Sequence, residues 1–126
     1  MRYVVPVVLV LVAIIHALPL VGVTGGARLA SLYGIADMDA NLEILLRHRA
    51  VLFGLLAAFL AFAAFKPELH GLALLGATIS VATFLAIALT TGGYGPAVAT
   101  VVKVDVVAVL LLAAGWFGHL ARSPAP

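Results

Sequence analysis

Four long apolar segments restrict the fold of this chain more than any other feature of its sequence. They cover about residues 3–21, 40–65, 68–91 and 97–120 of the 126 residues. A helix of about 20 apolar residues crosses the hydrocarbon layer of a bilayer. Backbone polar groups in lipid must be hydrogen-bonded within the protein, which these segments can achieve as helices. The sequence therefore predicts an all-α, polytopic integral membrane protein, a single domain folded as an antiparallel bundle of four transmembrane helices.

The composition supports the same class. The chain is 65% hydrophobic and 10% charged, whereas soluble domains are about 45–50% apolar and about 25% charged. A soluble chain of this length could not bury so much apolar surface. The absence of cysteine excludes disulfides and thiolate metal sites. The seven Lys and Arg residues form no basic run, so nucleic acid is not expected as a partner.

Local signals divide the apolar segments from one another. The first segment resembles a signal peptide, but its length and the lack of a small-residue cleavage site predict a retained helix. Pro67 separates the second and third helices, and residues 92–96 (Gly-Gly-Tyr-Gly-Pro) form a turn before the fourth. The one long connection, residues 22–39, contains Asp37 and Asp39 as candidate N-caps of the second helix. Residues 28–33 fit either a short interfacial helix or an ordered loop.

Ionisable residues gather in one half of the predicted bilayer. Antiparallel helices bring to the same depth His16, Glu43, Arg47, His48, Arg49, Lys103 and Asp105. Ionisable groups at such depth are costly and usually pair inside a bundle. Glu43 precedes Arg47 by four residues, which favours an ion pair within the helix. Arg47 could also bind Asp105 in a bidentate contact.

Small residues predict which helix faces point inward, because they allow close packing in lipid. The second helix carries such a stripe at residues 50, 54, 57, 58, 61 and 64. Continued toward the N-terminus at the same spacing, this stripe includes Arg47 and Glu43. On the fourth helix Asp105, Ala108, Leu112, Gly115 and His119 share one line. We therefore expect Arg47 to face the interior, while Lys103 extends along the helix surface toward the interface. Arg49 points away from Arg47 around the helix, so one of these two arginines is expected to extend to the interface as well. On this expectation, Arg47→Ala is more damaging than Arg49→Ala.

Three functions fit this pattern. The first is a polar pocket that binds a small lipid-like or anionic ligand, with His16, Arg47, His48, Arg49 and Lys103 as ligand-binding residues. Glu43 and Asp105 would then be candidate acid/base groups, although enzymatic activity is left open. The second is a non-catalytic scaffold or accessory subunit, in which Glu43, Arg47 and Asp105 form a structural ion-pair network. The third is b-type haem binding by His16 and His48; no dedicated metal site and no specific cofactor is predicted.

The stretch Glu43…Arg47-His48-Arg49-Ala50-Val51-Leu52-Phe53-Gly54, preceded by a Leu-Tyr-Gly, carries a family resemblance. It resembles small uncharacterised bacterial inner-membrane proteins that are similar to the broad DoxX-like group. The resemblance implies a compact four-helix bundle in the bacterial cytoplasmic membrane. Some DoxX-like relatives are linked to quinone or sulfur redox systems, but this chain supplies no redox centre. Some similar proteins carry a phosphopantetheine adenylyltransferase label, but the nucleotide-binding motif of that soluble fold is absent from the sequence.

Charge outside the predicted spans indicates the orientation. An even number of spans puts both termini on one side, together with Arg2, Lys66 and Arg122, and leaves Arg28 on the other side. Since cytoplasmic loops are enriched in Lys and Arg, the termini are predicted to be cytoplasmic. Expected partners are membrane lipids and, through the small-residue faces, a second copy or another subunit.

Overall fold

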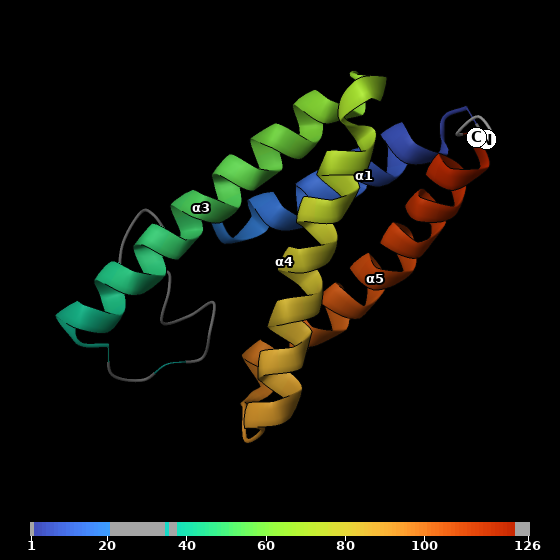
Figure 1. Ribbon diagram of the computed structural model, residues 1–126. Helices are drawn as coiled ribbons and strands as arrows, with labels where there is room; N and C mark the ends of the chain where they lie inside the picture. The colour runs from blue at the N-terminus through green and yellow to red at the C-terminus, as the bar shows by residue number, and fades with distance from the viewer. Residues whose placement is uncertain (1, 21–34, 36–37, 123–126) are drawn as a thin grey trace.

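The computed structural model describes residues 2–20, 35 and 38–122, and within these residues the regular structure is entirely helical (Figure 1). The elements in chain order are α1 (Val4–Ala17), α3 (Ala40–Ala64), the short 3-10 helix η2 (Pro67–Leu69), α4 (His70–Thr91) and α5 (Pro96–Arg122). The predicted all-α class is confirmed. Residues 28–33, for which either a short interfacial helix or an ordered loop was expected, lie outside the described residues, as does the rest of the long connection apart from residues 35 and 38–39.

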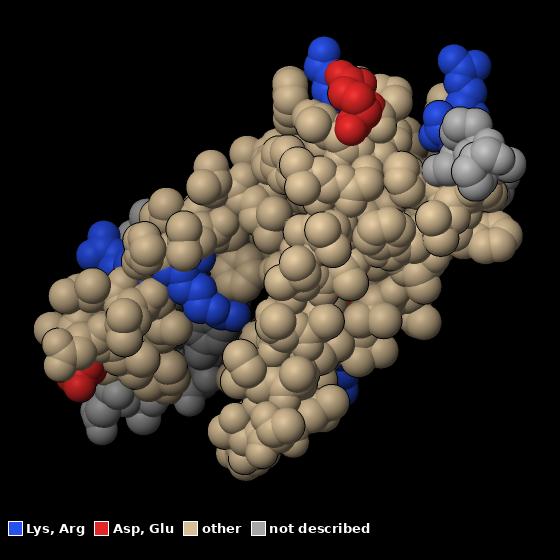
Figure 2. Space-filling model, in the orientation of Figure 1, with Lys and Arg blue, Asp and Glu red and all other residues tan. Residues whose placement is uncertain are grey.

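Three helical stretches are long and apolar enough to cross a membrane. They are Ala40–Ala64, Pro67–Thr91 and Pro96–Arg122, and Val4–Leu20 is a shorter apolar helix. Large hydrophobic side chains such as Leu55, Ile87 and Leu110 point outward and are about two-thirds exposed. In Figure 2 the visible middle of the molecule is nearly free of charged residues, which gather toward the helix ends. An apolar outer surface of this kind is suited to lipid, so the protein is a membrane protein.

The helix ends follow from local chemistry. Asp39 caps α3, because its Oδ1 accepts a hydrogen bond of 2.7 Å from the backbone N–H of Leu42. Pro67 ends the continuous helix, and the chain turns through η2 into α4. Gly92 and Gly93 leave α4 with φ angles of 66° and 69°, a left-handed conformation that glycine adopts without a steric penalty. Pro96 then begins α5 at a position where its missing N–H costs nothing.

Helix α1 is the centre of the packing. It packs against both α3 and α5, and α4 packs mainly against α5. Its residues Val5, Leu9 and Val12 are fully buried. They share a core with Leu60, Ala63, Ala73, Leu74, Ala77 and Val81. Within the described residues the backbones of α3 and α5 do not meet, because α1 and α4 lie between them.

The helices α3 and α4 meet at one end of the bundle, which we call the closed end, and diverge toward the other end (Figure 1). At the closed end Arg122 donates a hydrogen bond of 3.3 Å to the carbonyl of Arg2, which joins the two ends of the described chain. At the α3–α4 corner the buried His70 donates from Nε2 to the carbonyl of Ala64 over 3.3 Å. From this corner α3 and α4 diverge, so the start of α3 and the end of α4 lie apart.

The crossing of α1 and α5 depends on glycine. A β-carbon on Gly118 would lie 2.9 Å from Cγ1 of Val4, and one on Gly115 would lie 3.0 Å from Cγ1 of Val8. Valine is stiff about its first side-chain torsion and cannot easily move aside. The two glycines therefore let the central helix approach α5 closely, as small residues do in membrane bundles.

Replacing Gly118 with leucine is expected to lower the free energy of unfolding by about 1–3 kcal/mol, the usual cost of overpacking. Gly76→Leu is the matched control, because no atom lies within 4 Å of a β-carbon built on Gly76. Thermal unfolding of both variants in the same detergent measures the difference. Equal stability of the two variants would contradict this packing of α1 on α5.

Candidate functional site

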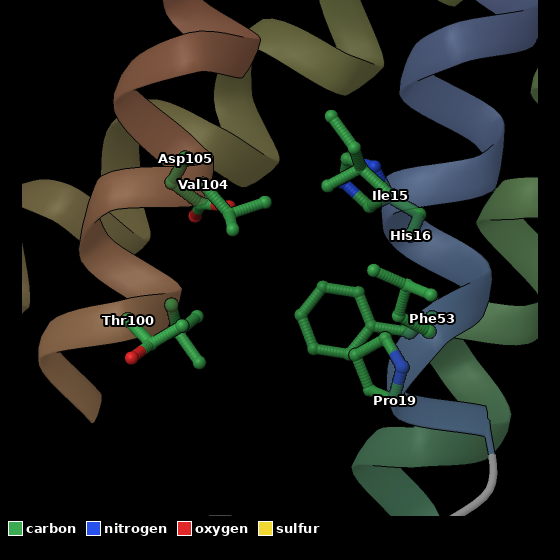
Figure 3. Close-up of a pocket in the computed structure, with 9 residues that line it drawn as sticks. Ile15, His16, Pro19, Phe53, Thr100, Val104 and Asp105 are labelled. Atoms are coloured by element: carbon green, nitrogen blue, oxygen red, sulfur yellow. The ribbon is translucent and has the colours of Figure 1, made fainter. Parts of the chain in front are cut away.

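The interior face of α5 leads to Asp105. Ala108, Leu112 and Gly115 are buried along one line of this helix, as the sequence predicted. Asp105 begins that line and is half-buried, facing the space between α5 and α1 (Figure 3). The carboxyl group accordingly lies inside the bundle and not on its lipid-facing surface.

On α3 the interior face passes through Arg49 and not through Arg47. The buried residues Ala50, Ala57, Leu60 and Ala64 define that face, whereas Ala58 and Ala61 of the predicted stripe are exposed. Arg49 is half-buried, while the side chain of Arg47 is 48% exposed. The prediction that Arg47 faces the interior is therefore wrong. Ala50, Ala57 and Ala64 belong to the predicted stripe and are buried. Small residues also pack well against lipid, so the stripe was too broad to determine which arginine faces inward.

Two aromatic rings surround the guanidinium of Arg49. Its central carbon lies 4.5 Å from the ring centroid of Phe53 on α3 and 5.7 Å from that of Phe84 on α4. A cation over the face of an aromatic ring is stabilised by the ring's quadrupole, more strongly when it is desolvated. The same guanidinium is also within electrostatic range of the Asp105 carboxyl group. Arg49 thus connects α3 with α4 and its charge extends to α5.

His16 joins α1 to α4 through its imidazole. The side chain is 4% exposed, and Nδ1 donates a hydrogen bond of 2.9 Å to the carbonyl of Val12. The carbonyl can only accept, so Nδ1 carries a proton. Nε2 of the neutral ring then accepts a hydrogen bond of 3.0 Å from the hydroxyl group of Ser80. The ring also contacts that of Phe53, with centroids 5.6 Å apart.

Each of the four described α-helices therefore contributes one polar side chain to the interior at this level. We call the set His16, Arg49, Ser80 and Asp105 the polar belt. His16 and Arg49 both contact Phe53, and Ser80 is hydrogen-bonded to His16. Asp105 lines one cavity together with His16 and Phe53. Ionisable groups from separate helices do converge inside the bundle, but the converging arginine is Arg49 and its acid is Asp105.

A cavity of about 170 Å³ lies beside the polar belt. Its walls come from α1, α3 and α5, and the lining residues are Ile15, His16, Leu18, Pro19, Phe53, Thr100, Val101, Val104 and Asp105. Figure 3 shows Asp105, Val104 and Thr100 on one side, with Ile15, His16, Pro19 and Phe53 opposite. The lining is apolar except for a carboxyl group, an imidazole and a hydroxyl group.

A second hollow of about 240 Å³ adjoins the first on the other side of Phe53. It is lined by Arg49, Leu52, Phe53, Leu56 and Ser80, where α3 and α4 diverge. Figure 2 shows an opening between these two helices, with atoms of basic side chains on the α3 side. Phe53 lines both spaces. In addition, His16, which lines the cavity, is hydrogen-bonded to Ser80, which lines the hollow.

The remaining predicted site residues lie outside the polar belt. Glu43 and Arg47 form the expected ion pair within α3, with Oε1 and Nη1 3.8 Å apart, on the exposed side of the helix. His48 and Lys103 are also exposed. None of these four residues lines the cavity.

Phe53, Phe84 and Thr100 were not singled out as functional residues from the sequence. Phe53 follows Arg49 by four residues, and this spacing puts both side chains on one helix face. That spacing was the one feature of the sequence that could have identified Phe53 as a site residue. Phe84 and Thr100 reach the site through the packing of separate helices, for which the sequence holds no comparable signal. Among the described residues, no group of three or more His, Asp or Glu side chains could hold a metal ion.

Comparison of the chain with protein-family models, curated proteins and solved structures gives no match. The chemistry of the site is therefore inferred from its own geometry.

Arg49→Ala is expected to destabilise the protein more than Arg47→Ala. Arg49→Ala removes the contacts with Phe53 and Phe84 and leaves Asp105 without its nearby cation, and such losses cost about 1–3 kcal/mol. Arg47→Ala removes an exposed pair within one helix, for which about 0.3–0.5 kcal/mol is typical. Thermal unfolding of the two variants in detergent gives the comparison. A larger loss for Arg47→Ala would restore the original assignment of the interior face.

Proposed function

We propose that this protein binds a small lipid-like molecule in the cavity beside the polar belt. The observation that carries the proposal is an apolar cavity inside a membrane protein that also exposes a carboxyl group to its interior. Ligand sites are typically apolar spaces with a few convergent polar groups that fix orientation. Membrane lipids and molecules dissolved among them are the compounds with direct access to such a site.

The size of the cavity limits what enters it. A cavity of about 150 Å³ in another protein accommodates benzene, and drug-sized ligands occupy about 300–1,000 Å³. At about 170 Å³, the cavity accommodates one ring or a short branched group. The remainder of a larger ligand would extend into the adjoining hollow or into the lipid.

Proton transfer is an extension of this proposal. Asp105 and His16 both line the cavity, and carboxyl and imidazole groups are common general acids and bases. Both ring nitrogens of His16 are already hydrogen-bonded to Val12 and Ser80, so a ligand would exchange its proton with the carboxyl group of Asp105. Glu43, the other candidate acid/base residue, lies on the exposed side of α3 in its ion pair with Arg47, so we assign the chemistry to Asp105.

A scaffold or accessory subunit is the alternative function. It is favoured by an open hollow on the outer face of α1 and α3, lined by small residues that include Ala13, Gly54 and Ala58, because such surfaces suit close helix packing. Purification of a stable complex of fixed stoichiometry would support it. Haem binding by His16 and His48 is disfavoured, because His16 already uses both ring nitrogens and His48 lies on the exposed surface.

We also propose that the four helices span a bacterial cytoplasmic membrane with both termini in the cytoplasm. Arg2 and Arg122 are in contact at the end of the bundle where the chain starts and finishes. Lys66 lies on the turn between α3 and η2. A reporter that is active only in the cytoplasm should be active when fused after Pro126 and inactive when inserted between Gly93 and Tyr94. The reverse result would invert the orientation.

Filling the cavity should abolish ligand retention. Val104 lines the cavity, so Val104→Trp places a bulky side chain in it. Val106 lies on the same helix but is 48% exposed, which makes Val106→Trp the matched control. Native mass spectrometry of gently purified protein should show a retained small molecule in the wild type and the control, and at least about tenfold less in Val104→Trp, equivalent to about 1.4 kcal/mol.

Thermal unfolding of the same samples verifies that the Val104→Trp protein is folded. Undiminished retention in a folded Val104→Trp protein would show that the bound molecule lies elsewhere. The absence of any retained molecule from the wild type under several mild detergents would count against the binding function itself.

A further inference from the structure

We infer that the ligand is an uncharged amphiphile whose ring-sized head group carries a hydroxyl, which donates a hydrogen bond to Asp105. This inference rests on the proposed function and specifies its ligand. It selects one class from the lipid-like and anionic molecules that the sequence left open.

The first support is the hydrogen bonding of the cavity wall. His16 uses both ring nitrogens within the protein, on Val12 and Ser80, and the hydroxyl of Thr100 donates to the carbonyl of Pro96 over 3.1 Å. Within the described residues, the carboxyl group of Asp105 accepts no hydrogen bond, although it lines the cavity. A carboxyl group in an apolar space is costly to leave without a hydrogen-bond donor. The wall therefore lacks a donor, which a ligand hydroxyl would supply.

The second support is the charge of the site. Arg49 carries a permanent positive charge and lies within electrostatic range of Asp105. An anionic head group would compete with Asp105 for that guanidinium and add a second negative charge to a weakly polar interior. A cationic head group would meet Asp105 and be repelled by Arg49. An uncharged hydroxyl makes the missing hydrogen bond without disturbing this balance.

The third support is the shape of the space around the site. The cavity holds one ring, and Phe53 separates it from a hollow whose other walls include Leu52 and Leu56. That hollow lies where α3 and α4 diverge toward the surroundings (Figure 1). On this inference the head group lies in the cavity and the tail lies along the adjoining hollow, whose lining is apolar apart from Arg49 and Ser80. The class that fits is a hydroxylated ring with a hydrocarbon tail.

A matched series of four probes tests the inference. They are 4-hexylphenol, hexylbenzene, 4-hexylbenzoate and 4-hexylbenzylammonium, which share ring and tail but differ in the head group. Each is titrated at neutral pH into the intact protein in one detergent, and binding is measured by the quenching of intrinsic fluorescence and by native mass spectrometry. We expect 4-hexylphenol to bind at least about tenfold more tightly than hexylbenzene, the gain typical of a hydrogen bond to a charged group.

Substitutions test whether the hydroxyl group of the probe binds at Asp105. Asp105→Ala should reduce the affinity for 4-hexylphenol about tenfold and leave hexylbenzene unchanged, while Glu68→Ala, which removes an exposed carboxylate from η2, should change neither. If Asp105→Ala does not fold, Asp105→Asn serves in its place, with a smaller loss because an amide oxygen is a weaker acceptor than a carboxylate. Val104→Trp should weaken all four probes.

The outcomes separate the two proposals. Tightest binding of the benzoate or the ammonium compound would overturn the inference and leave the binding function intact. Equal binding of 4-hexylphenol and hexylbenzene would do the same, since no hydrogen bond would then be made. Failure of every probe to bind, together with the absence of a retained molecule, would overturn the proposed function.

Discussion

A guanidinium held inside an apolar bundle is the constraint on which this architecture depends. Arg49 can neither lose its proton nor remain in hydrocarbon without compensation. Among the described residues, the rings of Phe53 on its own helix and Phe84 on α4 lie beside it, and the Asp105 carboxyl group on α5 is within electrostatic range. The contact with Phe84 links the rotation of α3 about its own axis to the position of α4.

Within the described residues, the helical class and the helix ends could be predicted because both are controlled by local chemistry. Apolar length predicted three helices long enough to cross a membrane and one that is shorter. Pro67 and Pro96 marked the breaks, and Asp39 acts as the expected cap. The interior line of α5 was also predictable, since a polar Asp105 and the close approach at Gly115 both require protein neighbours. On α3 the same reasoning was right for Ala50, Ala57 and Ala64 but wrong for Ala58, Ala61 and Arg47. Alanine is equally suited to lipid and to a helix interface, and the buried Leu60, a large residue, lies outside any pattern of small ones.

The site itself was only half predictable. The convergence of ionisable groups at one depth follows from antiparallel topology, and of the residues it named, His16, Arg49 and Asp105 lie around Phe53. Which arginine lies in the bundle interior depends on the rotation of α3 about its axis, and this rotation is set by packing across the whole bundle. The roles of Ser80 and Phe84 depend on the angle at which α4 leaves the corner beside His70. Such angles arise from many side-chain contacts together and are not written in any single stretch of sequence.

The shortness of the central helix has a consequence for the surrounding bilayer. At 1.5 Å per residue, the apolar stretch Val4–Leu20 extends about 26 Å, whereas the 27 residues of α5 extend about 40 Å. Both helices cannot match one hydrocarbon thickness while standing upright. Long helices reduce such a mismatch by tilting, and short ones by thinning the lipid nearby. The splayed outline of the bundle in Figure 1 is therefore the shape expected of long helices that lean around a short one.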